Sequence, residues 1–246
     1  MHEFSRYSDF DHFAWIYNKH WAYGQRALPV LERLILRHLT DGARILDLCC
    51  GTGQGTQALL QRGYRVDGLD GSEEMLRFAR KNAPDGNFIL EDVRTFKSTP
   101  VYDGVISLFD SLNHVMTLDE LSLTFRNVYA ALVGGGIFVF DLNMEEGYKQ
   151  RWQGSFGIVE DDHACIVRSS YSEQEKVARF DATMFRLEEE WHRSDVTLLQ
   201  RCYSEEEIRF ALGEAGFSDI RTYDGHGNID ESGTAGRLYF VGLKPE

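Results

Sequence analysis

A glycine-rich segment with acidic and sulfur-bearing neighbours is the first stretch of this sequence that could do chemistry. Residues 46–55 read LDLCCGTGQG, in which Gly51 and Gly53 follow the adjacent cysteines Cys49 and Cys50. Glycines at this spacing let the backbone turn closely around a ligand, whose polar groups then meet the N–H groups at the start of a helix. The two cysteines raise a second possibility, which is a metal or redox site.

The cysteine pattern argues against metal or redox chemistry. The chain has four cysteines, at positions 49, 50, 165 and 202, and none of them forms a CxxC pair. Adjacent cysteines cannot easily ligate one metal ion together, and no histidine or cysteine stands at ligand spacing from them. We therefore interpret Cys49 and Cys50 as small fillers of a tight turn and expect no metal site.

Two acidic residues accompany the glycine turn and indicate which nucleotide it would bind. Asp70 ends the next apolar run, where a carboxylate can accept hydrogen bonds from both ribose hydroxyls. A dinucleotide turn prefers Gly-x-Gly-x-x-Gly, but the third glycine position is Thr56. Asp47 lies inside the end of the first run and suits a ligand with a positive charge and an ammonium group better than a pyrophosphate.

The elements that must position these residues alternate between strand and helix. Ser72 and Thr117 have the types and spacing of helix caps, and the helix after Thr117 is expected to end at Gly134-Gly135-Gly136. Short apolar runs predict buried parallel strands at Arg44–Leu48, Tyr64–Leu69, Phe88–Leu90, Gly104–Phe109 and Gly136–Leu142. This alternation predicts a doubly wound α/β sheet with its ligand site at the carboxyl ends of the strands.

The alternation of strand and helix ends after Leu142. Residues 155–203 contain the segments ACIVRSSY, KVARFDATMFRL and DVTLLQRCY, which predict a three-stranded antiparallel insertion. Ser204 and Glu207 then open another capped helix that stops at Gly216. Two final strands, near residues 219–223 and 238–243, predict an antiparallel hairpin at one edge of the sheet.

The N-terminal 25 residues are rich in aromatic side chains. They fit either a helix that packs its aromatic face on the domain or a lid that covers a bound ligand, and the residues concerned are Phe4, Tyr7, Phe10, Phe13, Trp15, Tyr17, Trp21 and Tyr23.

The charge balance restricts the class of partner. The 246 residues include 26 Lys and Arg against 39 Asp and Glu, a net charge of −13, which disfavours a large nucleic-acid surface and favours a small neutral or cationic ligand. The N-terminus has no signal-peptide pattern, and no apolar run approaches the roughly 18 residues of a membrane helix. We expect a cytoplasmic protein without membrane or nucleic-acid partners.

From about Tyr17 to the C-terminus, the chain resembles the class I S-adenosylmethionine-dependent methyltransferases, and in particular small-molecule enzymes such as sugar and amine N-methyltransferases. The resemblance rests on four ordered motifs, DLCCGTG, VDGLDGSEEML, LEDV and YDGVISLFDSLNHV. It implies S-adenosyl-L-methionine as cofactor and a Rossmann-like, seven-stranded sheet. It also implies one domain over residues 1–246, with aromatic lid helices in residues 1–40 and a β insertion in residues 145–203 covering the substrate side.

The resemblance also assigns cofactor contacts to individual residues. Asp70 would bind the ribose, the Asp92 carboxylate the adenine amino group and the Val93 N–H a ring nitrogen. Other expected contacts lie in the glycine turn, beside the adenine, beside the methionine moiety and on the lid, and they are Asp47, Cys49, Gly51, Gly53, Gly71, Met75, Leu108, Phe109 and Tyr17.

Methyl transfer is an in-line displacement that needs alignment, exclusion of water and, for some acceptors, removal of a proton. Asp110 and His114 follow the fourth strand, and we take His114 as the candidate base, although it could also cap the next helix or simply pack. His163, His192 and Arg201 lie in the insertion and are expected on a solvated strand face, and Glu188–Glu190 in a charged turn.

Three functions compete on sequence grounds. A methyltransferase acting on a small molecule fits best, with RNA or protein as alternative acceptors. An NAD-type oxidoreductase is disfavoured by Thr56 and Asp47. A non-catalytic module that binds S-adenosylmethionine or S-adenosylhomocysteine would keep the same motifs. The sequence leaves the methylated atom and the oligomeric state open.

Overall fold

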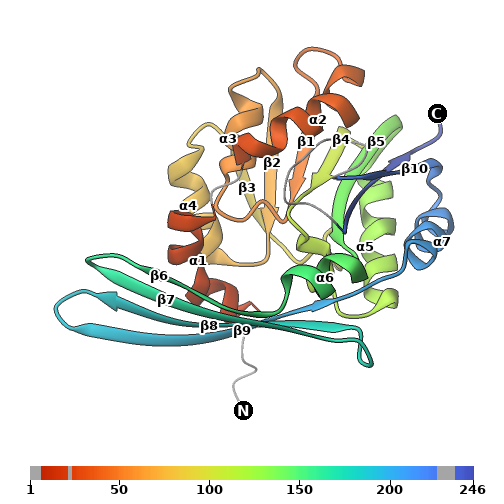
Figure 1. The fold of residues 1–246 in the computed structure, drawn as a ribbon. Coiled ribbons are helices and arrows are strands. Elements are labelled where there is room, and N and C mark those ends of the chain that lie inside the picture. Colours follow the sequence, from red (N-terminus) through yellow and green to blue (C-terminus); the bar gives the residue numbers. More distant parts are fainter. Residues whose placement is uncertain (1–6, 22–23, 226–235) are drawn as a thin grey trace.

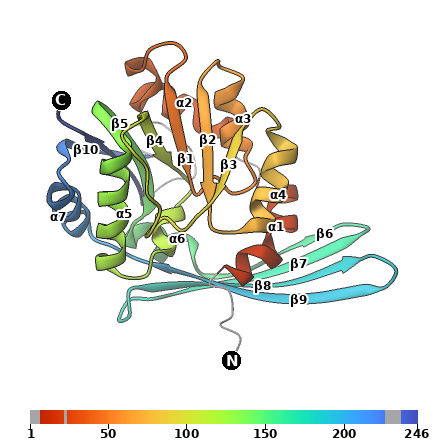
Figure 2. The same ribbon diagram turned by 180° about the vertical axis from the view of Figure 1, so that it is seen from behind.

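The computed structural model describes residues 7–21, 24–225 and 236–246, so Phe4 and Tyr23 lie outside the described residues. Its strands form a seven-stranded sheet flanked by helices and a separate four-stranded sheet. Figure 1 and Figure 2 both show the second sheet lying across one end of the α/β unit, with helix α1 between the two.

The seven-stranded sheet has the order β10-β11-β5-β4-β1-β2-β3. Strand β11 is antiparallel to both of its neighbours, while the pairs among β1 to β5 are parallel, which confirms the doubly wound sheet with an antiparallel C-terminal hairpin. The strands are β1 (Arg44–Leu48), β2 (Arg65–Asp70), β3 (Asn87–Leu90), β4 (Tyr102–Ser107), β5 (Leu132–Asn143), β10 (Ser218–Asp224) and β11 (Arg237–Leu243).

Local capping explains where several helices begin. Ser72 accepts from the Met75 N–H, Thr117 accepts from the Glu120 N–H, and Ser204 forms a full capping box with Glu207, as predicted. The α-helices are α1 (Ser8–His20), α2 (Leu28–Leu34), α3 (Gln54–Leu60), α4 (Glu73–Asn82), α5 (Leu118–Ala131), α6 (Glu145–Arg151) and α7 (Glu205–Ala215).

The end of α5 differs from the prediction. The helix ends at Ala131, before the three glycines, because Leu132 is already extended and opens β5. Gly135 and Gly136 instead exchange backbone hydrogen bonds with Lys244, so the glycines join the C-terminal segment to the sheet.

The insertion has four strands, and the prediction of three was wrong. The missed strand is β6 (Gly154–Val159), which pairs with β7 only and is mostly exposed, so it shows no alternation of apolar and polar residues. The other strands, β7 (His163–Ser172), β8 (Val177–Leu187) and β9 (Trp191–Arg201), cover the three predicted segments.

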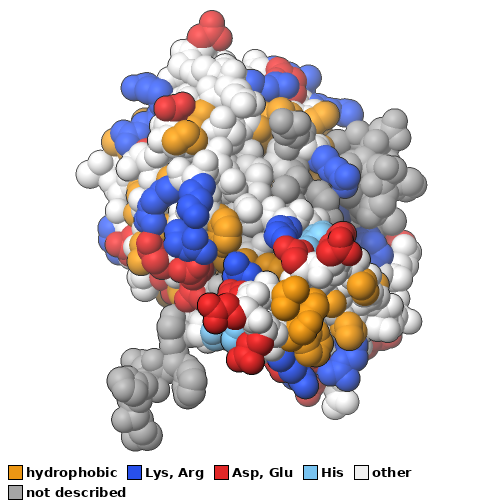
Figure 3. Space-filling view, turned by 90° about the vertical axis from the view of Figure 1, so that its left-hand side faces the viewer, with side chains coloured by type: hydrophobic (Ala, Val, Ile, Leu, Met, Phe, Trp, Pro, Cys, Tyr) orange, Lys and Arg blue, Asp and Glu red, His pale blue; other side chains and the backbone are white. Residues whose placement is uncertain are grey.

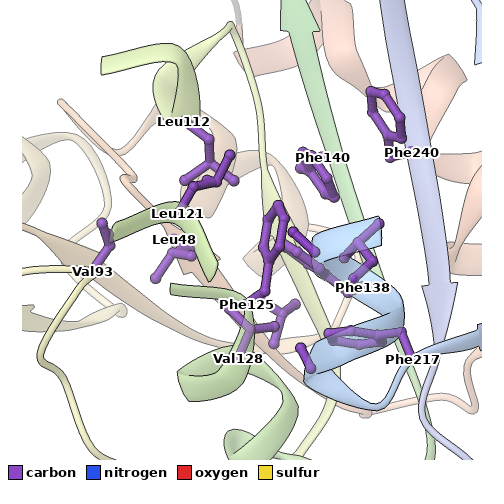
Figure 4. Close-up of a cluster of buried hydrophobic side chains, with 14 of the residues drawn as sticks. Leu48, Val93, Leu112, Leu121, Phe125, Val128, Phe138, Phe140, Phe217 and Phe240 are labelled. Atoms are coloured by element: carbon purple, nitrogen blue, oxygen red, sulfur yellow. The ribbon is translucent and has the colours of Figure 1, made fainter. Parts of the chain in front are cut away.

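Aliphatic and aromatic side chains form the core between the central sheet and helices α5 and α7 (Figure 4). Phe140 stacks on Phe138 and on Phe240, with ring centroids 4.7 and 5.1 Å apart. A second cluster on the opposite face of the sheet joins α2 and α3 to β1 and β5. These two layers fix the carboxyl ends of the strands that carry the glycine turn.

Helix α1 forms a third cluster between α4 and the second sheet. Phe13 and Ile16 are buried, and they pack with Met75 of α4 and with Met184 and Val196 of the second sheet. The aromatic N-terminal segment is thus both a packed helix and a cover over the end of the α/β unit.

The surface mixes charges of both signs. The face in Figure 3 shows acidic and basic side chains interspersed, with an apolar group low on the molecule. Exposed apolar residues at the hairpin end of the second sheet include Val159, Leu187 and Trp191. Over the described ranges, none of the helices has the length and apolarity needed to cross a membrane.

Candidate active site

A cavity of about 410 Å³ lies between the carboxyl ends of the central strands, helix α1 and the second sheet. This volume falls in the range of small-molecule sites. A smaller cavity adjoins it and shares the lining residues Tyr17, Trp21, Cys49, Phe109 and Ser111. The glycine turn and the turn after β4 therefore face one continuous region.

The turn between β1 and α3 repeatedly uses left-handed backbone. Cys49, Gly51 and Gly53 have φ values of 62°, 54° and 79°. Gly53 is the N-cap of α3, and a Cβ there would lie 2.9 Å from Ala79 of α4, so its role is close packing and not lining of the cavity. Gly51 lines the larger cavity, and its N–H donates to Asp70 at 2.9 Å.

Asp70 lies on the wall of the larger cavity, with its carboxylate fixed by backbone donors. It accepts from the N–H groups of Gly51 and Ser72, both at 2.9 Å. Burial raises the pKa of Asp70 to about 6, against the lowering effect of these hydrogen bonds. Further hydrogen-bond donors, such as the two hydroxyls of a ribose, would stabilise the ionised form of this carboxylate.

Asp47 lies on the wall of the smaller cavity, together with Leu108. Its carboxylate is 6% exposed and accepts from the Thr56 hydroxyl at 2.7 Å. Burial raises the pKa of Asp47 to about 6, and the hydrogen bond from Thr56 acts in the opposite direction. A cationic ligand group beside Asp47 would favour its ionised form.

The two cysteines of the turn are half-buried thiols. Burial raises the pKa of Cys49 and of Cys50 well above the ordinary value, so neither is a ready thiolate nucleophile. Within the described ranges, no group of three or more His, Cys, Asp or Glu side chains is arranged to hold a metal ion. Cys49 itself has a left-handed backbone, a conformation that favours glycine.

The segment after β3 presents Val93 and Arg94 to the larger cavity, while Asp92 is absent from its lining. The Asp92 carboxylate accepts from the Arg94 N–H at 2.9 Å and from Nε at 2.7 Å, and it forms an ion pair with the same guanidinium. Burial acts to raise the pKa of Asp92, but the bonds from Arg94 outweigh it and leave the pKa lowered. Arg94 therefore already binds the carboxylate that was expected to accept a hydrogen bond from the adenine amino group.

Tyr17, Gly71 and Met75, for which cofactor contacts are predicted, line the larger cavity. Tyr17 comes from α1 and lies over the glycine turn, where a Cβ on Gly51 would be 3.6 Å from its Cε1 atom. Tyr7, Phe10 and other aromatic residues of the N-terminal segment complete this wall.

The turn after β4 is strained and anchored by a buried acid. Phe109 and Asp110 have φ values of 60° and 53°, which are rare for residues with side chains. Their N–H groups donate to the Asp141 carboxylate at 2.6 and 3.0 Å. Arg237 of β11 forms ion pairs with both Asp110 and Asp141. This network holds Asp110 on the cavity wall.

His114 lies in the 3-10 turn η3 (Ser111–His114) and lines the same cavity. Its Nδ1 is 2.7 Å from the Leu199 carbonyl oxygen, and its Nε2 is 3.1 Å from the Gln200 amide nitrogen. Burial lowers the pKa of His114, although Asp110 and the Leu199 carbonyl act to raise it.

Several lining residues were not predicted from the sequence. They come from α6, β8, β9 and β11, and they are Arg151, Trp152, Phe180, Leu198, Gln200 and Arg237. These elements are far apart in the sequence, so only the three-dimensional fold brings the six residues together. Spacing along the chain offers no signal for them.

Neither cavity is lined by the three insertion residues considered in the sequence analysis, which are His163, His192 and Arg201. His192 is exposed as expected, and Arg201 stacks on Tyr203 at 5.6 Å. His163 is only 3% exposed, so its prediction as a solvated residue was wrong. It faces α1, where its Nε2 lies 2.7 Å from Nε2 of His20.

Comparisons with known proteins identify the family. A model described as a methyltransferase domain matches residues 45–136. The Bacillus subtilis protein YqeM, whose name places it among the methyltransferases without a stated substrate, is 31% identical over 212 residues, which cover 84% of this chain and 86% of YqeM. The chain belongs to the S-adenosylmethionine-dependent methyltransferase family.

Two further proteins resemble this methyltransferase over most of its length. The dTDP-3-amino-3,4,6-trideoxy-alpha-D-glucopyranose N,N-dimethyltransferase of Streptomyces venezuelae is 28% identical, covering 85% of this chain and 86% of the relative. The amino pentose methyltransferase CalS10 of Micromonospora echinaspora, solved with S-adenosylmethionine bound, has a TM-score of 0.73 at 24% identity, covering 93% of this chain and 96% of CalS10.

The cavities fit the cofactor of the family. Acidic side chains stand at two separate points, Asp70 and Asp47, where the methyltransferase could receive the ribose hydroxyls and the amino group of S-adenosyl-L-methionine. The missing third glycine and the acid at the end of β1 do not suit a dinucleotide. The NAD-type alternative is therefore not favoured.

Proposed function

We propose that this methyltransferase transfers a methyl group from S-adenosyl-L-methionine to the amino group of a small molecule. The observation that carries the proposal is the shared cavity. Asp110 and His114 line the same cavity as eight of the residues expected to bind the cofactor, namely Tyr17, Cys49, Gly51, Asp70, Gly71, Met75, Val93 and Phe109.

The two cavities suggest how the chain would hold the cofactor. Asp70 would accept the ribose hydroxyls, while Met75 and the Val93 backbone would border the adenine. Asp47 and Leu108 border the smaller cavity, which suits the amino-acid part, and Tyr17 and Phe109 lie where the two cavities meet. Arg94, which binds Asp92, lies on the adenine side and would contact the ring in place of the carboxylate.

The remaining part of the larger cavity would receive the acceptor. Its wall combines the aromatic side chains of Trp152 and Phe180 with the carboxylate of Asp110 and the imidazole of His114. A carboxylate attracts an ammonium group, and a neutral imidazole can take the proton that an amine must lose. The imidazole could serve either an amine or a hydroxyl, so the carboxylate is the feature that favours an amine acceptor.

The arrangement of the cover supports a small acceptor. Helix α1 packs between the α/β unit and the second sheet, and both contribute side chains to the cavity wall. We propose that residues 1–40 and 145–203 cover the substrate side in this way and exclude water from the reacting groups. Such an enclosure leaves little room for a folded RNA or protein surface.

Relatives with stated substrates favour the same chemistry. Besides the Streptomyces venezuelae enzyme, which is named for an amino sugar, a glycine/sarcosine N-methyltransferase of Aphanothece halophytica is 28% identical over 73% of this chain. Both names state methylation of nitrogen.

Matched acceptors test this proposal. The purified protein is given methyl-labelled S-adenosylmethionine with dTDP-3-amino sugars, with the same sugars bearing a hydroxyl in place of the amine, with glycine, and with bulk RNA. We expect labelled N-methyl product from an amine, with kcat/KM at least about 100-fold above that of its hydroxyl partner. Preferential methylation of a hydroxyl partner or of RNA would contradict the proposal.

A further inference from the structure

Gln200 of β9 occupies the centre of a hydrogen-bond network that joins the second sheet to the turn after β4. Its side chain is 2% exposed. Its amide nitrogen lies 2.6 Å from Asp110 Oδ2 and 3.1 Å from His114 Nε2, while its Oε1 lies 2.9 Å from the Tyr148 hydroxyl. All hydrogen-bonding atoms of the amide are thus engaged.

The partners fix which way the amide points. A carboxylate oxygen 2.6 Å away accepts a hydrogen bond, so the amide NH₂ must face Asp110. The reversed orientation would place two acceptor oxygens against each other at that distance. With the amide in this orientation, its second N–H points to His114 and Oε1 accepts from the Tyr148 hydroxyl.

The same argument fixes the protonation of His114. The Leu199 carbonyl only accepts, so Nδ1 of His114 must carry a hydrogen. The Gln200 NH₂ only donates, so Nε2 must carry a lone pair. Both ring nitrogens are satisfied by one state alone, the neutral imidazole with Nδ1 protonated.

We propose that Gln200 is a positioning residue, which holds His114 as the neutral Nδ1–H imidazole and keeps the Asp110 carboxylate oriented beside it. The functional consequence rests on the proposed amine methylation. Of the two bonds from the amide, that to His114 is the longer, so an acceptor N–H could replace it while Gln200 stays bound to Asp110. The packing of the second sheet against the turn after β4 would then hold His114 in the neutral state that can accept a proton.

Other charged or titratable groups also surround this network. Asp110 precedes the turn that bears His114, and Phe10 of α1 meets the imidazole edge-on at 5.1 Å without carrying charge. The remaining groups come from β5, α6 and β11, and they are Asp141, Tyr148, Arg151 and Arg237. Arg237 forms ion pairs with both carboxylates of this network.

Nitrogen NMR of ¹⁵N-histidine-labelled protein tests the proposal without an acceptor. The His114 signals are assigned by their loss in His114→Asn. We expect the wild-type protein at pH 7 to show the neutral Nδ1–H tautomer. In Gln200→Glu, a carboxylate that accepts from Nε2–H would raise the pKa of His114 by about one unit or more. Gln153→Glu, at an exposed glutamine that donates to the Lys149 carbonyl, provides the matched control for replacing an amide by a carboxylate and should leave the signals unchanged.

The outcomes are decisive. An Nε2–H tautomer or a charged His114 in the wild-type protein at pH 7 would overturn the proposal, as would an unchanged His114 titration in a folded Gln200→Glu protein. If that variant does not fold, the wild-type tautomer still decides. Absence of amine methylation in the acceptor experiment would leave this NMR result intact, so the two failures are distinguishable.

Discussion

Asp47 is buried and Asp70 is half-buried, and their carboxyl groups lie at different parts of the proposed cofactor site. Each is hydrogen-bonded, yet burial still raises the pKa of both to about 6. An unfolded chain would titrate them near 4. Between about pH 4 and pH 6, the folded protein therefore holds more protons on these groups than the unfolded chain does. Their contribution to the stability of the ligand-free protein falls as the pH rises through this window.

The same shifts predict how cofactor binding depends on pH. An ammonium group on Asp47 and ribose hydroxyls on Asp70 favour the ionised carboxylates, so binding of S-adenosylhomocysteine should release protons near pH 6. We expect affinity to increase between pH 5 and pH 7.5, by about tenfold for each carboxylate that must ionise. Titration calorimetry in buffers of different ionisation enthalpy measures both quantities. Affinity that is flat or falls with pH, or proton uptake, would argue against these two contacts.

At the scale of elements, the glycine turn depends on how closely it approaches α4. Gly53 has positive φ, and a Cβ there would meet Ala79. Gly63 also has positive φ, at 87°, but a Cβ there would meet nothing within 4 Å. Both positions have positive φ, but only Gly53 is closely packed. Alanine at Gly63 is therefore a matched control for alanine at Gly53.

Alanine at these two positions should therefore have unequal effects. Gly63→Ala should lower the free energy of unfolding by about 1–2 kcal/mol through backbone strain alone. Gly53→Ala should cost the same plus about 1–3 kcal/mol for the overpacked contact with α4. Urea denaturation monitored by circular dichroism measures both losses. Equal losses would show that the contact with α4 relaxes freely.

Elements with local signals could be predicted, and elements without them could not. Apolar runs and capping side chains located β1 to β5, α4 and α7 to within a few residues, because burial and caps act over short spans. Strand β6 was missed because most of its residues are exposed and it pairs with β7 alone. The cofactor turn belongs to one local motif, but Gln200 and Arg237 reach the site only through long-range packing.

At the scale of the whole molecule, the two sheets and helices α1, α4 and α6 enclose the proposed reaction space. The glycine turn, Asp70 and the turn after β4 form the floor, whereas α1 and strands β8 and β9 supply the opposite wall. We propose that the cofactor spans both cavities in a defined direction. Its ribose would lie on Asp70, and its amino-acid part would lie on Asp47.

Calorimetry with two ligands tests that direction most directly. S-adenosylhomocysteine carries the amino-acid part, and 5′-methylthioadenosine lacks it. Asp47→Asn should weaken binding of S-adenosylhomocysteine by about tenfold to a hundredfold, the cost of losing a charge-assisted hydrogen bond, and leave 5′-methylthioadenosine unaffected. Asp70→Asn should weaken both ligands. Equal weakening of both ligands by Asp47→Asn, or no effect of Asp70→Asn on either, would contradict this placement.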